Sequence, residues 1–188
     1  MYAQVLHECK PITEKPLKLS RLGKPVAAAG EVLIKVRACG ICRTDLHVVE
    51  GELNTARYKL PVIPGHQVVG RVAAVGAETT RFSVGQRIGV AWINGACGQC
   101  DYCRNGYENL CADFVATGRD AHGGYADFMT VDEGFAFPIP ERFSDAQAAP
   151  LLCAGAIGYR SLALCRMRDN QCLGLTGFGA SAHLVLKM

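Results

Sequence analysis

The chain has 188 residues, of which 49% are hydrophobic and 20% charged, and its formal net charge is +3. This length allows a buried core and one domain or a little more. Because the Lys and Arg residues are scattered along the chain, neither nucleic acid nor an anionic membrane is expected as a partner.

The cysteine content is informative once the compartment is considered. Residues 1–11 lack a basic segment followed by an apolar run, and no apolar run approaches the length of a membrane span, so we expect a cytoplasmic protein. Its ten cysteines are then expected to be reduced, which makes metal binding the leading use for those that cluster.

The first three quarters of the chain are predicted to form strands. Residues 1–8 and 32–38 have strand patterns and are separated by a stretch rich in Pro and Gly, which argues against a helix there. Residues 61–76, 85–92 and 124–131 are apolar, with glycines placed as bulges or bends require. Residues 1 to about 140 are therefore predicted to form an antiparallel, partly barrel-like β domain.

The first reactive stretch follows the strand at 32–38. It reads Cys39-Gly40-Ile41-Cys42-Arg43-Thr44-Asp45-Leu46-His47 and holds two thiols, a cation, a hydroxyl, a carboxylate and an imidazole. Gly40 permits a bend, and Thr44 or Asp45 can cap a short helical turn. A site at a strand end is one interpretation. The alternative is a surface turn whose cysteines act as small hydrophobic residues.

The character of the sequence changes after residue 140. Ser144 and Gln147 fit a capping box, and residues 145–168 are predicted to form two helices divided near residues 153–155. A short strand at 172–176 is then expected to lead into Gly177-Phe178-Gly179-Ala180-Ser181-Ala182, which opens a helix at 180–187. This G-x-G-x-x-A pattern between a strand and a helix is typical of dinucleotide binding, with Gly177, Gly179 and Ala182 at the motif positions.

A four-cysteine motif gives the strongest local signal. Cys97, Cys100 and Cys103 are spaced C-x-x-C-x-x-C, and Cys111 follows. Four thiolates suit a closed structural zinc site with no open position. An iron–sulfur cluster is the nearest rival, but the bacterial ferredoxin motif places its fourth Cys after three residues and follows it with Pro.

A second metal site is a hypothesis on three separated residues. Cys42, His66 and Cys153 remain as candidate ligands, although each taken singly also fits a packed or hydrogen-bonded core residue. Two Cys and one His with an open fourth position form a known type of catalytic zinc site.

Taken in order, these motifs resemble the medium-chain zinc-dependent alcohol dehydrogenases along the whole chain. The matching segments are the stretch from Cys42 to His47, Gly65-His66, the segment from Trp92 into the cysteine motif, Cys153, and Gly177-x-Gly179. The resemblance implies a GroES-like catalytic domain over residues 1–150 with a structural zinc lobe at 92–113. Residues 151–188 would then be connecting helices and the first βα unit of a Rossmann NAD(P)-binding domain.

The resemblance also implies two zinc ions per chain and a role for each motif residue. Cys42, His66 and Cys153 would hold the catalytic zinc, and Cys97, Cys100, Cys103 and Cys111 the structural one. Hydride would pass between a small alcohol or aldehyde and NAD or NADP, and full-length relatives form homodimers or homotetramers. The implied roles are a proton relay for Thr44 and His47, orientation of His66 for Asp45, cofactor contact for Arg43, Gly177, Gly179 and Ala182, and a pocket wall for Trp92.

Simpler roles remain as alternatives, and one position departs from the family. Thr44 also fits a helix cap, Arg43 a solvated charge and Trp92 core filling. Gln67 stands where the family usually has Glu, which leaves the neighbourhood of the metal one unit less negative.

The sequence stops soon after the glycine motif, so we expect a truncated polypeptide that binds zinc but has little or no dehydrogenase activity. An apolar strand edge at its end would favour aggregation. The alternatives are a catalytically silent zinc-binding fragment that acts, if at all, through protein partners, and a zinc-free quinone reductase of the same superfamily.

Overall fold

A five-stranded antiparallel sheet forms the centre of the molecule. The computed structural model describes residues 1–53 and 58–188. The sheet has the strand order β8-β3-β4-β5-β9, and two smaller antiparallel sheets pair β1 with β2 and β6 with β7. The strands are β1 (Tyr2–Leu6), β2 (Leu17–Arg21), β3 (Glu31–Gly40), β4 (Gln67–Val75), β5 (Arg87–Val90), β6 (Ile93–Gly95), β7 (Val115–Ala116), β8 (Phe128–Asp132) and β9 (Ala136–Pro138).

The largest buried cluster lies on one face of this sheet and is built from β-branched and other apolar side chains. Along β3, Val32 and Ile34 are fully buried on the face toward this core, while on the other face Leu33 is buried and the charged Lys35 is exposed. Pairing of β3 with β4 shifts register twice, and such bulges bend the sheet. The buried cluster consists of Val32, Ile34, Val68, Val72, Phe82, Ile88, Val90, Met129, Val131 and Ala136.

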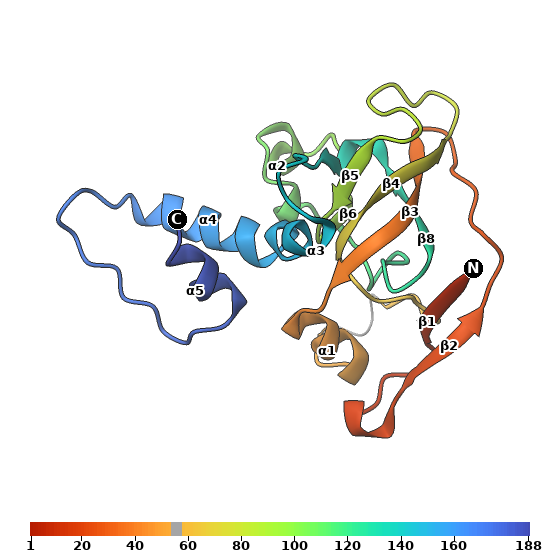
Figure 1. The fold of residues 1–188 in the computed structure, drawn as a ribbon, viewed down its shortest axis with the longest axis horizontal. Helices are drawn as coiled ribbons and strands as arrows, with labels where there is room; N and C mark the ends of the chain where they lie inside the picture. The colour runs from red at the N-terminus through yellow and green to blue at the C-terminus, as the bar shows by residue number, and fades with distance from the viewer. Residues whose placement is uncertain (54–57) are drawn as a thin grey trace.

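Helices cover the ends and the second face of the sheet. Helix α1 (Arg43–Glu50) packs Val48 and Val49 on Leu6 and Val62, and α3 (Asp145–Ala148) continues into the 3-10 helix η5 (Ala149–Leu152) against β4. Figure 1 shows α4 (Ala154–Cys165) leaving the sheet and α5 (Ala180–Val185) returning beside it. The remaining short helices are η1 (Ile12–Glu14), α2 (Asp101–Arg104), η3 (Glu108–Leu110) and η4 (Glu133–Phe135).

The mainly β prediction is confirmed, as are the capping box and the helix break. Ser144 Oγ accepts from Gln147 N at 3.2 Å, and Gln147 Oε1 accepts from Ser144 N at 2.9 Å. The helices divide at Cys153, as predicted. In the described part of the chain, the only helices that reach the length and hydropathy of a membrane span do so as a pair, 145–152 with 154–165, bent by 48°.

Several predicted boundaries are wrong. Residues 172–176 form no strand, because no described segment pairs with them. The exposed strand edge that was expected there is therefore not formed either. Helix α4 ends at Cys165, not at residue 168, since Arg166 is in the left-handed region with φ +48°. Strand β2 was not predicted, because the Pro and Gly residues around it were interpreted as turns. Finally, α5 ends at Val185, not at residue 187, and β4 and β8 begin later than the predicted strands.

Candidate metal centres and the adjoining cleft

The pairing of β3 with β4 brings Cys42 and His66 to the same end of the sheet. Gly40 and Gln67 form the last pair of this register, so Cys42 follows one strand where His66 precedes the other. The turn before β4 depends on Gly65, whose φ is +97°. A Cβ there would lie 2.6 Å from the Tyr125 ring and 2.8 Å from Cys39 Sγ, so only glycine fits before His66.

The third residue, Cys153, arrives from the second face of the sheet. A Cβ on Gly89 of β5 would lie 2.7 Å from Leu152 Cδ1, so this glycine allows η5 to pack closely on the sheet. Cys153 follows Leu152 directly, where the backbone turns into α4. The result is a distance of 3.9 Å between Cys153 Sγ and Cys42 Sγ, across 111 residues of sequence.

These three side chains, the "Cys2His group" of Cys42, His66 and Cys153, fit a zinc ion. Their ligand atoms all lie within 4.8 Å of one another. His66 is 1% exposed, and its buried Nε2 has no hydrogen-bond partner among the described residues. Tetrahedral zinc with Zn–S bonds of about 2.3 Å places two sulfurs about 3.8 Å apart, close to the separation found here. Three ligands leave one position open.

Asp45 fixes the orientation of His66. Its Oδ1 lies 3.0 Å from His66 Nδ1, and its Oδ2 accepts from Cys42 N at 2.7 Å. With its proton on Nδ1, the imidazole presents the lone pair of Nε2 to the ion. The predicted cap of α1 is corrected: Cys42 is the N-cap and Asp45 is the N3 residue of a capping box, so neither Thr44 nor Asp45 is the cap itself.

The electrostatics of the Cys2His group favour a thiolate at Cys42. The neighbouring Cys153 thiol, 3.9 Å away, and the nearby His66 imidazole lower the pKa of the Cys42 thiol to about 3. Cys42 in turn raises the pKa of the Cys153 thiol. Burial works against a charged His66, but its hydrogen bond to Asp45 and the nearby Cys42 thiolate outweigh burial and raise the pKa of the imidazole to about 9. The group thus holds positive and negative partners in contact.

The predicted relay residues lie on α1 beside this group. Thr44 Oγ1 lies 3.7 Å from Cys42 Sγ, within the range of an S–H···O contact. His47 lies one turn further along and its Nδ1 contacts the Glu52 carboxylate in a half-exposed position. Trp92 presents its ring to that of His66 in an edge-on contact, with centroids 5.0 Å apart. The roles of these residues remain predictions.

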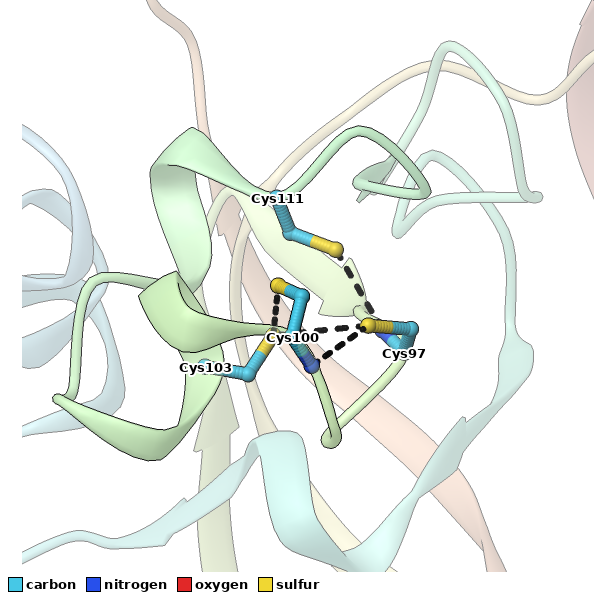
Figure 2. A group of neighbouring side chains, drawn as sticks. All are labelled: Cys97, Cys100, Cys103 and Cys111. Carbon is cyan, nitrogen blue, oxygen red and sulfur yellow. Dashed lines mark hydrogen bonds between the residues drawn. The ribbon is translucent and has the colours of Figure 1, made fainter.

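The four-cysteine lobe converges on a second point, with the ligand atoms again within 4.8 Å of one another (Figure 2). Cys103 Sγ lies 3.5 Å from Cys100 Sγ and 3.9 Å from Cys97 Sγ, as a tetrahedral zinc site requires. Cys100 is the N-cap of α2, and Cys111 follows η3. Backbone N–H groups of Gln99 and Cys100 lower the pKa of the Cys97 thiol to about 6, which favours the thiolate that a metal binds.

A cleft of about 540 Å³ joins the Cys2His group to the glycine motif. Its walls contain Cys42 and Cys153 together with all four of the residues predicted to contact a cofactor: Arg43, Gly177, Gly179 and Ala182. Gly177 has a φ of +76°, so the turn uses the freedom of glycine. The cleft thus brings the Cys2His group and the glycine motif, which are far apart in the sequence, to the same place in the fold.

Sequence reasoning missed the part of α4 that lines this cleft. Gly158 and Ser161 both face it, and a Cβ on Gly158 would lie 2.8 Å from Val185 Cγ2, so this glycine lets α5 approach α4. Its position inside an alanine-rich helix was the available signal. Gln67, noted only as a departure from the family, is buried and also lines the cleft.

Known proteins are similar to this chain in both sequence and fold. Residues 28–141 match the alcohol dehydrogenase GroES-like domain. The chain belongs to the medium-chain alcohol dehydrogenase family. A probable alcohol dehydrogenase, AdhA of Mycobacterium tuberculosis, is 49% identical over 183 residues, which are 95% of this chain and 52% of that protein. The chain therefore spans about half the length of this relative.

Solved structures of longer proteins superpose on the chain. A cinnamyl alcohol dehydrogenase from Sorghum bicolor superposes with a TM-score of 0.86 at 33% identity. The match covers 99% of this chain and 54% of the Sorghum protein. The Helicobacter pylori enzyme CAD, solved with NADP(H), has a TM-score of 0.86 at 26% identity, over 100% of this chain and 56% of its own. In both comparisons, the match covers little more than half of the longer protein.

Proposed function

We propose that this chain is the metal-binding half of a zinc-dependent, NAD(P)-linked alcohol dehydrogenase. The observation that carries the proposal is the convergence of Cys42, His66 and Cys153, with a buried His66 Nε2 that has no partner within residues 1–53 and 58–188. The cleft leading to Gly177 and Gly179 supports it, since a hydride acceptor must lie beside the bound alcohol. The same proposal assigns residues 1–150 to a GroES-like catalytic domain with a zinc lobe at 92–113. It assigns residues 151–188 to connecting helices and the start of a Rossmann domain.

The proposed reaction is hydride transfer between the carbon of a small alcohol or aldehyde and a nicotinamide. A zinc ion in the Cys2His group would supply Lewis acidity, which lowers the pKa of a bound alcohol. Thr44 can accept and donate a proton, so it suits the inner end of a relay. His47, half exposed and in contact with Glu52, suits the outer end, where protons exchange with water.

The remaining residues of the cleft are proposed to position the cofactor and to neutralise its charge. Arg43 places a cation in the cleft, where it would pair with the pyrophosphate of a dinucleotide. Gly177 and Gly179 leave room for that pyrophosphate to approach the backbone at the start of α5. The identity of the bound nicotinamide cofactor, NAD or NADP, is open in this proposal, and a neighbour solved with NADP(H) supports the general class. The four-cysteine lobe is proposed to hold a structural zinc.

Zinc content of the purified chain tests this proposal. We expect two zinc ions per chain, one for each group. Cys42→Ala should remove one and Cys103→Ala the other, while the matched control Cys9→Ala, outside both groups, should retain two. One zinc in the parent chain, unchanged by Cys42→Ala, would refute the dehydrogenase proposal and favour a silent fragment that binds zinc only in its lobe.

For the 188 residues on their own, we propose zinc binding with little or no turnover. The segment at 172–176 pairs with no strand in the described part of the chain, and α5 alone cannot position a dinucleotide. Measurable NAD(P)-dependent oxidation of ethanol by the zinc-loaded chain would contradict this part of the proposal and leave the zinc assignment intact.

A further inference from the structure

One buried guanidinium outside the metal groups packs on the only tryptophan of the chain. Arg119 is 9% exposed, and its Cζ lies 5.6 Å from the centroid of the Trp92 ring. The same indole meets His66 edge-on at 5.0 Å. Trp92 therefore contacts both a zinc-ligand candidate and a cation, and the residues that fix the cation also help to fix the ring.

Asp120 fixes the guanidinium in place. Arg119 Nε and Nη2 donate to the two carboxylate oxygens of Asp120 at 2.7 and 2.6 Å, a bidentate pair. Asp120 Oδ2 also accepts from Ala116 N at 2.9 Å, which ties the carboxylate to the end of β7. Both charged residues are more than nine-tenths buried, so neither moves freely in solvent.

The turn that carries Arg119 also grips the backbone of Trp92. Thr117 N donates to Trp92 O at 2.9 Å, and Thr117 Oγ1 donates to Ala91 O at 2.8 Å. Backbone and ring are thus held from one short turn, 116–121. A pair needed only for stability could face solvent, whereas this one is buried with its cation over the indole.

We infer that Arg119 is a positioning residue, fixed by Asp120, that holds Trp92 against His66 and so limits the size of the alcohol admitted beside the Cys2His group. The part of this inference that concerns alcohol size rests on the proposed function. The part that concerns Trp92 does not, because it follows from the contacts of Arg119 alone. A variant that loosens the indole should make room beside His66.

Fluorescence tests the positioning of Trp92 directly, because the chain has one tryptophan. In the zinc-loaded chain, Arg119→Met should shift the emission to longer wavelength and increase quenching by acrylamide. Arg119→Lys, which keeps the charge but loses the planar fork, should give a smaller shift. The matched control is Arg142→Met, since Arg142 lies over Phe143 at 4.8 Å on the surface and far along the chain from Trp92. Unchanged emission in both Arg119 variants would overturn the inference.

If Arg119→Met does not fold, Arg119→Lys decides the question alone. Circular dichroism and zinc content confirm that the variant is folded, and emission identical to the parent then overturns the inference. A folded Lys variant with shifted emission supports it.

The limit on size is tested with two neutral nitrogen ligands for a metal ion, imidazole and the bulkier 4-phenylimidazole. Both are titrated against the Co²⁺-loaded chain and followed by the cobalt absorption. Arg119→Met should narrow the gap in affinity between the small and the large ligand. An unchanged gap overturns the role in size selection. Failure of the parent chain to bind either ligand would instead overturn the proposed function, while the fluorescence result still decides the role of Arg119.

Discussion

Asp45→Asn should weaken zinc binding at the Cys2His group while leaving the four-cysteine lobe unchanged. In the structure, one carboxylate oxygen of Asp45 faces His66 Nδ1 at 3.0 Å and the other accepts from Cys42 N at 2.7 Å. Asparagine has one oxygen and one NH₂ group in the same shape. Cys42 N can only donate, so the amide oxygen must face it and the NH₂ group must face His66.

That arrangement favours the wrong tautomer of the imidazole. Facing an NH₂ donor, His66 Nδ1 has to accept, which moves the ring proton to Nε2, the atom that should carry the lone pair toward zinc. Loss of such an outer partner lowers metal affinity by about 10–100-fold, equivalent to about 1.4–2.7 kcal/mol. We expect Asp45→Asn to fall in this range, because its side chain faces both Cys42 and His66 from a buried position.

The assay is a zinc titration in competition with a chelator, resolved into two classes of site. Asp132→Asn is the matched control, because Asp132 Oδ1 also accepts from a backbone N–H, that of Gly134 at 2.6 Å, and belongs to neither metal group. Only Asp45→Asn should weaken the class that Cys42→Ala removes. Equal affinities in Asp45→Asn and the parent chain would refute the reasoning about the tautomer.

Two further predictions concern stability, both measured by urea unfolding. Gly65→Ala should destabilise the chain by about 1–3 kcal/mol, since its φ is +97° and its Cβ would lie 2.6 Å from Tyr125. Gly85→Ala, with φ +90° but open space around it, is the control and should cost less; equal losses would show that the contact does not matter. Burial lowers the pKa of His122 below its ordinary 6.5, and Ile63 N donates to its Nδ1, so the fold favours the neutral imidazole. The stability that this residue contributes is therefore present above pH 6.5 and is lost as the pH falls below that value. His122→Gln should remove this pH dependence, and an identical pH profile would count against it.

Local patterns in the sequence were enough to predict structural features whose stabilising contacts lie close together along the chain. The spacing of Cys97 to Cys111 encodes a lobe that closes on itself, and the capping box at Ser144 involves residues three positions apart. The alternation in 32–38 gave β3. In each case the stabilising contacts lie within a few residues or within one strand, so a pattern in the sequence is sufficient to indicate them.

Structural features that depend on residues distant in the sequence were either not predicted or predicted wrongly. Strand β2 exists because β1 pairs with it, despite an unfavourable composition around it. The apolar run at 172–176 lacks such a partner among the described residues and remains irregular, although its composition favours a strand. Arg119 was overlooked for the same reason: its sequence neighbour Asp120 suggests an ordinary surface pair, and only the fold places the indole of Trp92 beneath it.

The Cys2His group lies between these two cases. Cys42 and His66 are brought together by one register, Gly40 opposite Gln67, and a shift of one residue would move the two segments past each other by about 3.4 Å. Cys153 depends on a different contact, the packing of Leu152 over Gly89. Because two independent features of the fold converge on one buried, unpartnered imidazole nitrogen, the geometry is better explained by a shared ligand than by packing alone.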